Sequence, residues 1–185
     1  SSVISAYGEP ELSGSIDEKK IKEKQQAISK KNYHLITNLD QIDEWIKEAE
    51  EVGEVAVDTE TSSLDAHQAD LIGVSLSSKI GKACYIPIGH KSSKCLKKDD
   101  VIKKLKPLLE DPSVKKIGQN IKFDFIVLYK HGITISSMED TMLMSYVLDA
   151  GKNRHNMDTL SEIHLGHKTI SFKEIVGTGK KEINF

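Results

Sequence analysis

The chain has 185 residues, of which 38% are hydrophobic and 29% charged, with a formal net charge of −2; this fits one globular domain, alone or with a tail. No stretch approaches the roughly 20 consecutive apolar residues of a membrane span, and no charged-then-apolar leader opens the chain, so we expect a cytoplasmic protein with no membrane partner. The near-neutral charge argues against a broad basic surface that coats nucleic acid, but it allows a protein that grips only a strand end.

Residues 1–31 are rich in Ser, Gly, Pro, Glu and Lys and contain few large apolar side chains. Such a segment cannot bury enough surface to offset its ordering entropy, so we predict a polar linker from an upstream domain. The pattern changes from residue 32, and we expect one domain over residues 32–185 that is incomplete at its C-terminal end. The sequence starts at Ser1 rather than at a methionine, and we therefore expect a piece of a longer protein.

The first half of this domain has the pattern of a helix followed by neighbouring strands. Tyr33–Ile36 is predicted as a short strand and Gln41–Ala49 as an amphipathic helix. Three strand-like runs with polar turns between them follow, at Glu54–Thr59, Leu71–Ser77 and Ala83–Ile88.

The second half alternates between helices and a strand. Pro107 should end or kink the first of these helices early. The predicted elements are a helix at Asp99–Glu110, a strand at Val114–Gly118, a helix at Asn120–His131 and two further helices at Asp140–Leu148 and Asp158–Leu165. Strands first, and then strands alternating with helices, predict an α/β domain with a mixed sheet.

Two acids end the strand Glu54–Thr59. Side chains alternate along a strand, so Asp58 and Glu60 should project from the same face, a few ångströms apart. Carboxylates this close repel each other unless a cation lies between them, and their hard oxygens suit magnesium or manganese. Taken alone, the motif also fits a pair of surface acids at the end of an edge strand.

A second motif, Lys116–Asp124, reads as a strand, a turn and the start of a helix. Asn120 can cap that helix, and Asp124 lies one turn further along on the same side. The structural alternative is that Asn120 is only a cap and Asp124 only an exposed acid near the positive end of the helix dipole.

Together, and in this order, the two motifs resemble the first two exonuclease motifs of the family A DNA polymerases. The resemblance covers roughly Tyr33 to Phe185, and its matching segments are Asp58–Asp65, Tyr85–His90, Leu105–Asp111, Gly118–Asp124, Asp140–Leu143, Arg154–Leu160 and His167–Phe172. The chain is thereby identified as similar to the proofreading 3′→5′ exonuclease domains of this family, which includes bacterial DNA polymerase I.

The resemblance implies a ribonuclease H-like fold, with a central mixed β-sheet flanked by helices and the acids at one edge. It implies two divalent cations, Mg²⁺ or Mn²⁺ with Zn²⁺ as an option at one position, that clamp the last phosphodiester of a single-stranded DNA 3′ end. One cation would activate the attacking water and the other would stabilise the leaving 3′ oxygen, which releases nucleoside 5′-monophosphates. By position, Asp58 would bridge both cations, Glu60 would hold the one that activates water, and Asp124 would anchor the second.

The resemblance also implies contacts with the substrate strand. Leu64 matches a leucine that wedges between the terminal bases, and Phe172 matches an aromatic residue near the terminal nucleotide. For these two residues, core packing is an equal alternative. Gln119, Asn120 and Arg154 match residues near the substrate, and arginine suits a bidentate phosphate contact.

The family has a third motif, in which a tyrosine is followed four residues later by an aspartate that completes the metal site. None of the tyrosines in this sequence is followed by aspartate at that spacing, and we expect the chain to be cut before the motif and before the polymerase domain of the parent chain. We therefore expect weakened metal affinity, slow or undetectable hydrolysis, and exposed apolar surface where the last helix would pack.

Two other functions are open. Some family members keep the fold but have lost the acids, and they serve only as a scaffold for the polymerase; the presence of Asp58, Glu60 and Asp124 favours a working site here. The second alternative is a ribonuclease of the RNase D type. Those enzymes more usually have a bulky aromatic residue after the second acid, where this chain has Thr61.

Overall fold

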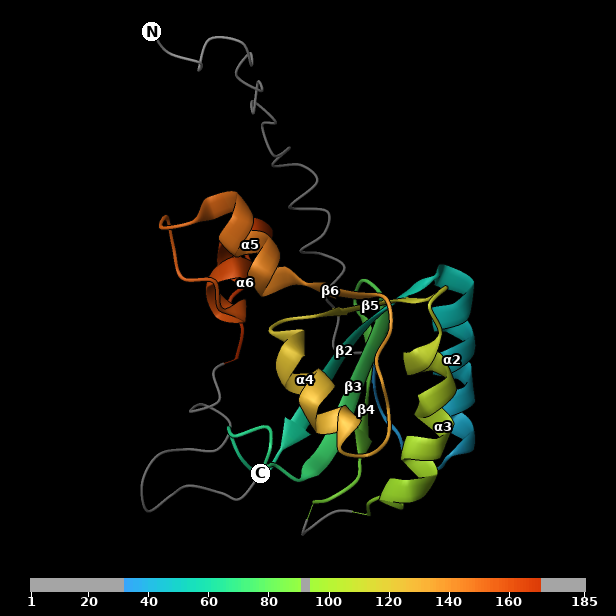
Figure 1. Ribbon diagram of the computed structural model, residues 1–185. Coiled ribbons are helices and arrows are strands. Elements are labelled where there is room, and N and C mark those ends of the chain that lie inside the picture. Colours follow the sequence, from blue (N-terminus) through green and yellow to red (C-terminus); the bar gives the residue numbers. More distant parts are fainter. Residues whose placement is uncertain (1–31, 91–93, 171–185) are drawn as a thin grey trace, which may run out of the picture.

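A computed structural model describes residues 32–90 and 94–170, and Figure 1 shows a twisted mixed six-stranded sheet with helices packed against it. The strand order is β1-β4-β3-β2-β5-β6. The strands are β1 (Tyr33–Leu35), β2 (Glu54–Thr61), β3 (Leu71–Lys79), β4 (Lys82–Pro87), β5 (Lys115–Gly118) and β6 (Met138–Asp140). Strands β2, β3 and β4 form an antiparallel meander, whereas β5 and β6 run parallel to β2. The mixed α/β sheet predicted from the sequence is confirmed.

Helices α2 (Asp40–Val52) and α3 (Lys98–Glu110) cover one face of the sheet (Figure 1). They bury Ile42 and Leu105 against strand residues such as Val57 and Leu76, all at most 3% exposed. Alternate residues of β2 therefore face this core, as the period of a half-buried strand requires. Helix α2 ends where Gly53 adopts a left-handed conformation with φ of 81° and donates its N–H to the Ala49 carbonyl.

Helix α4 (Ile121–Tyr129) packs against β2 and β6, and its Val127 and Leu128 belong to the same buried core as Ile42 and Leu105. Beyond β6 the chain leaves the sheet, and α5 (Thr141–Asp149) and α6 (Met157–Leu165) form a separate pair of helices (Figure 1). Asp140 caps α5 by accepting hydrogen bonds from the N–H groups of Met142 and Leu143. Among the described residues, no helix combines the length and the apolar character that crossing a membrane requires.

The structure corrects three local predictions. Pro107 lies inside α3 and does not end it early, because the helix continues to Glu110 with Leu108 and Leu109 buried in the core. The short strand β6 was not predicted, since its three residues carry no alternating pattern. Asn120 does not cap α4 with its side chain; it takes a left-handed conformation with φ of 58°, and its N–H donates to Asp140.

Candidate active site

Strand β2 brings Asp58 and Glu60 to the sheet face opposite the α2–α3 core. The neighbouring positions Val57 and Thr59 are buried, and Asp58 is exposed on the other side. In the antiparallel ladder with β3, Asp58 pairs with Ser75 and Glu60 pairs with Gly73. The two acids therefore share one face, as the sequence predicted.

Helix α4 supplies the third acid to the same region. Asp124 is 3% exposed, and its Oδ1 accepts hydrogen bonds from the backbone N–H of Thr59 at 2.8 Å and from the Thr59 hydroxyl at 2.6 Å. The alternative that Asp124 is an exposed surface acid is therefore wrong. Because Thr59 stands between Asp58 and Glu60 in the sequence, these two bonds bind the helix directly to the acid-bearing segment of β2.

The backbone explains why a helix residue can reach this strand. The pairing of β2 with β5 runs only from Glu54 to Ala56, and β5 ends at Gly118. Thr59 lies past the end of that pairing, and a strand N–H there needs a partner other than a neighbouring strand. The left-handed turn at Asn120 begins α4 immediately after β5, and Asp124 fills the place that a longer β5 would have occupied.

The three carboxylates raise one another's pKa values. Burial and then the charge of Glu60 raise the pKa of Asp58 to about 6. Burial raises the pKa of Asp124 to about 6, and the charge of Asp58 adds to the increase, whereas the hydrogen bonds from Thr59 lower it. The pKa of Glu60 is raised by burial and by the charge of Asp124. Asp58 is exposed in surface area, yet the surrounding protein still desolvates it.

The donor set fits a hard divalent cation in its chemistry. All three groups are carboxylates, and none of them forms an ion pair with a lysine or arginine of the described residues. In residues 32–90 and 94–170, however, no three His, Cys, Asp or Glu side chains are grouped closely enough to hold a metal ion. A bound cation would have to draw the carboxylates together.

The positions expected near the substrate lie in different environments. Leu64 is 99% exposed, so core packing is wrong for this residue. Arg154 is exposed and lines a pocket of about 480 Å³ between α5 and α6, beside Tyr146 and His155. Phe172 lies outside the described residues.

Gln119 and Asn120 are already engaged within the chain. The Gln119 amide donates to the His155 carbonyl at 2.7 Å, and its oxygen accepts from the Thr141 hydroxyl. Asn120 donates its backbone N–H to Asp140 at 2.9 Å, while no hydrogen bond from its side chain caps the helix. Gln119 therefore joins α4's first turn to the α5–α6 pair.

Thr59 was not singled out by the sequence motifs. A threonine in a strand is ordinary, and its side chain points away from the face of Asp58 and Glu60. Only the three-dimensional arrangement shows that its backbone N–H and hydroxyl both contact Asp124.

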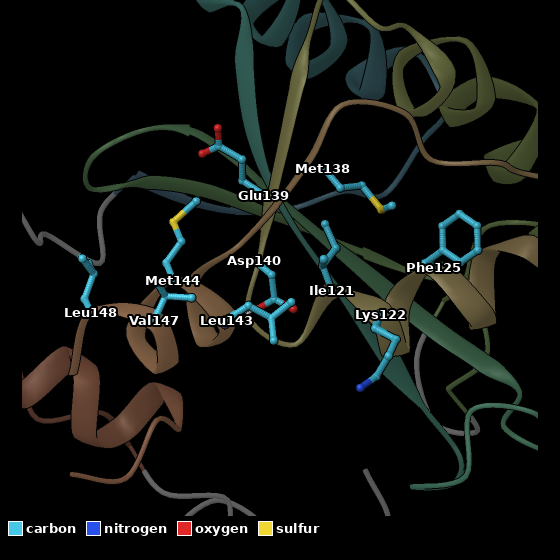
Figure 2. Close-up of a pocket in the computed structure, with 10 residues that line it drawn as sticks. All are labelled: Ile121, Lys122, Phe125, Met138, Glu139, Asp140, Leu143, Met144, Val147 and Leu148. Carbon is cyan, nitrogen blue, oxygen red and sulfur yellow. Dashed lines mark hydrogen bonds between the residues drawn. The ribbon is translucent and has the colours of Figure 1, made fainter. Parts of the chain in front are cut away.

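An apolar groove of about 740 Å³ lies between α4, β6 and α5. Figure 2 shows Ile121 and Phe125 on one side of this groove and Leu143, Met144 and Val147 on the other. Leu143 is 60% exposed and Val147 84% exposed. Asp58, Glu60 and Asp124 do not line the groove.

The sequence is similar to a known protein family and to bacterial DNA polymerases. The model of a protein family described as "3'-5' exonuclease" matches residues 33–185. DNA polymerase I of Rhizobium leguminosarum is 43% identical over 83% of this chain and 17% of its own length. DNA polymerase I of Pseudomonas aeruginosa is also 43% identical, over 83% of this chain and 18% of its own length. The chain thus spans about a sixth of these curated relatives.

Solved structures with this fold include nucleases. Brucella melitensis NrnC with bound Mg²⁺ is 26% identical, with a TM-score of 0.56 over 80% of this chain and 68% of that chain. RNase D of Escherichia coli, an exoribonuclease, is 20% identical, with a TM-score of 0.62 over 80% of this chain and 36% of that chain. At that lower identity the likeness shows the fold alone. The ribonuclease H-like architecture expected from the sequence agrees with both.

Proposed function

The chain belongs to the 3′-5′ exonuclease family, and we propose that it removes nucleotides one at a time from the 3′ end of single-stranded DNA. The observation that carries this proposal is the link that Thr59 makes between Asp124 of α4 and the segment of β2 that bears Asp58 and Glu60. The reaction would be hydrolysis of the last phosphodiester, with a nucleoside 5′-monophosphate as the product.

Asp58, Glu60 and Asp124 would hold two divalent cations, Mg²⁺ or Mn²⁺, with Zn²⁺ as an option at one position. When bound, such cations make a water nucleophilic at neutral pH and stabilise negative charge on the leaving oxygen. Burial, followed by the charge of a neighbouring carboxylate, raises the pKa of Asp58 and of Asp124 to about 6. This supports the assignment, because a bound cation would stabilise the ionised carboxylates.

The protein's own part would be to place the carboxylates before the substrate arrives. Thr59 keeps one Asp124 oxygen turned to β2, which leaves Oδ2 for a cation. The hydrogen bonds from Thr59 also lower the pKa of Asp124 against the effect of burial. They therefore favour the ionised form that a cation needs.

The substrate strand would be contacted around this cluster. Leu64, which is exposed on the segment after β2, would touch a base. Arg154 is exposed and would contact a phosphate. Gln119 and Asn120 would act less directly, because Gln119 already makes two hydrogen bonds within the chain. Phe172 is retained as an expected contact of the terminal nucleotide.

We also infer the setting in which the domain works. The curated relatives are DNA polymerases, and this chain corresponds to about a sixth of their length. A polymerase domain in the same polypeptide is therefore the proposed partner, and removal of misincorporated nucleotides is the proposed role. The two alternatives are a scaffold without catalysis and a ribonuclease, the latter because exoribonucleases share the fold.

The test is release of labelled mononucleotide from a 3′-labelled single-stranded DNA oligonucleotide with manganese. The Asp58→Ala chain is assayed beside it, and a 3′-labelled RNA of the same sequence is assayed as a second substrate. We expect slow release from DNA that disappears in the variant. Release of mononucleotide that persists in Asp58→Ala would contradict the proposal, and so would cleavage inside the strand. Faster release from RNA would favour the ribonuclease. No release by either chain would fit a site that lacks the third motif, and the assay would then be repeated with the missing helix restored; no release from that longer chain would favour the scaffold.

A further inference from the structure

Tyr85 lies on the same face of the sheet as the acids. In the ladder between β3 and β4, Tyr85 pairs with Ser75, and Ser75 in turn pairs with Asp58 across β2 and β3. Directly paired residues project from the same face of an antiparallel sheet. Asp58, Ser75 and Tyr85 thus form one row across three strands, with Asp124 on the far side of Asp58.

Gly73 gives the tyrosine its direction. A Cβ built on Gly73 would lie 2.0 Å from the Tyr85 hydroxyl oxygen, so the hydroxyl occupies the space that a side chain would fill. Gly73 is the residue paired with Glu60. The Tyr85 side chain therefore lies diagonally across β3, from the row of Ser75 toward Gly73. Its hydroxyl lies over Gly73, the residue paired with Glu60.

His90 holds that hydroxyl in place. Its Nε2 lies 2.5 Å from the Tyr85 Oη, and the two rings meet edge to face with centroids 5.6 Å apart. His90 lies on the turn after β4, which ends at Pro87. A residue just beyond the strand therefore fixes the side chain of Tyr85 within it. A half-buried tyrosine with both a fitted space and a hydrogen-bond partner has one defined orientation.

The charge around this hydroxyl suits a donor to a phosphate. Burial, followed by the negative charge of Glu60, raises the pKa of Tyr85 to about 12, so the hydroxyl stays protonated at neutral pH. A lysine or arginine at this place would pair with the carboxylates and compete with a cation. With His90 Nε2–H donating to the Tyr85 Oη, the neutral hydroxyl keeps its own proton to donate to an anionic oxygen, and it does so without neutralising the acids.

We propose that Tyr85 is a substrate-binding residue of the acid site, whose hydroxyl, oriented by the positioning residue His90, donates a hydrogen bond to the sugar–phosphate backbone of the 3′-terminal nucleotide. It forms the wall on the β3–β4 side of Asp58 and Glu60, opposite α4. This inference rests on the proposed function, because it needs a nucleic acid 3′ end at the acids.

The test is the affinity of the 185-residue chain for a fluorescein-labelled hexathymidylate, measured by fluorescence anisotropy with Ca²⁺. Calcium binds the same carboxylate oxygens as magnesium. Tyr85→Phe keeps the ring and removes only the hydroxyl, so we expect binding about tenfold weaker, as for a lost hydrogen bond to a charged group. Tyr33→Phe, on the edge strand β1, is the matched control and should bind as the unchanged chain does. Melting temperature reports on folding.

His90→Gln keeps the inference testable if Tyr85→Phe melts at a lower temperature. Because His90 acts through Tyr85, this change should weaken binding on its own and add nothing in the Tyr85→Phe background. Unchanged affinity in folded Tyr85→Phe, or additive losses in the double variant, would overturn the inference alone. If the unchanged chain bound an oligonucleotide with a 3′-phosphate as tightly as one with a free 3′ end, the proposed function and this inference would both fail.

Discussion

Asp124 on α4 accepts two hydrogen bonds from one residue of β2, Thr59, and that residue stands between the other two acids of the site. The bonds join the first turn of α4 to the part of β2 that lies beyond its pairing with β5. They also lower the pKa of a carboxyl that burial and Asp58 raise. The position of one acid and its ionisation thus depend on a single threonine.

Thr59→Val tests this dependence with almost no change of shape. The variant keeps the backbone bond but loses the hydroxyl bond to a buried carboxylate, so we expect the free energy of unfolding to fall by about 2 kcal/mol. The pKa of Asp124 should rise, and Mn²⁺ affinity should fall about tenfold. Urea denaturation measures the change in the free energy of unfolding, and titration calorimetry measures the change in Mn²⁺ affinity. Thr134→Val, at an exposed site, is the control; an equal loss in both variants would show that the hydroxyl bond is unimportant.

Asp58→Asn should affect stability in a pH-dependent way. The pKa of Asp58 is raised from 3.8 to about 6 in the folded chain, so the folded state holds this proton more tightly than the unfolded state does. The stability that Asp58 contributes is complete below about pH 4 and is lost as the pH rises through 6. Without cations, the variant should therefore gain stability relative to the unchanged chain between pH 4 and 7. Denaturation curves across that range measure the difference, and a constant difference would contradict the raised pKa.

Gly73→Ala should disturb the site from the neighbouring strand. A Cβ at Gly73 would lie 2.0 Å from the Tyr85 hydroxyl oxygen, a distance that no packed atoms share. The phenol must move, and we expect a loss of about 1–3 kcal/mol in the free energy of unfolding, typical of overpacking. Gly73→Ala combined with Tyr85→Ala should recover most of the strain that Gly73→Ala adds. If Gly73→Ala costs as much in the Tyr85→Ala background, the clash is not the cause.

The groove between α4 and α5 should bind an apolar dye. Leu143 and Val147 are 60% and 84% exposed along it, and exposed apolar surface of this kind binds 8-anilinonaphthalene-1-sulfonate. We expect dye fluorescence at neutral pH that falls at least about twofold in Val147→Gln with no loss of melting temperature. Val52→Gln, at an exposed residue of α2, is the matched control. Equal fluorescence in Val147→Gln and the unchanged chain would place the bound dye elsewhere.

The sequence could predict the elements whose pattern is local. The period-two run of β2 placed Asp58 and Glu60 on one face, and the structure confirms that placement. The helix predicted over Asn120–His131 is followed by Gly132 in a left-handed conformation with φ of 78°, which a glycine adopts readily after a helix. Each of these depends on a few neighbouring residues and on the backbone geometry that they permit.

The parts that could not be predicted depend on contacts between distant segments. Nothing in the pattern around Asn120 shows that Asp140 takes its N–H and that its backbone is left-handed. The burial of Asp124 follows from where β5 stops relative to Thr59, which no local signal encodes. Leu64 carries the same ambiguity, because a leucine after a strand can pack inside or project outward, and here it is exposed.

Titration of the 185-residue chain with Mn²⁺ tests the central claim, that Asp58, Glu60 and Asp124 form a cation site. Binding would be followed by the loss of the free-Mn²⁺ paramagnetic resonance signal at pH 7.5, for the unchanged chain and for Asp58→Asn, Glu60→Gln and Asp124→Asn. We predict saturable binding that each of these variants weakens at least about tenfold. Asp65 is an exposed acid on the loop after β2, and Asp65→Asn should leave the binding unchanged. Binding that survives all three substitutions, or that falls equally in Asp65→Asn, would contradict the account.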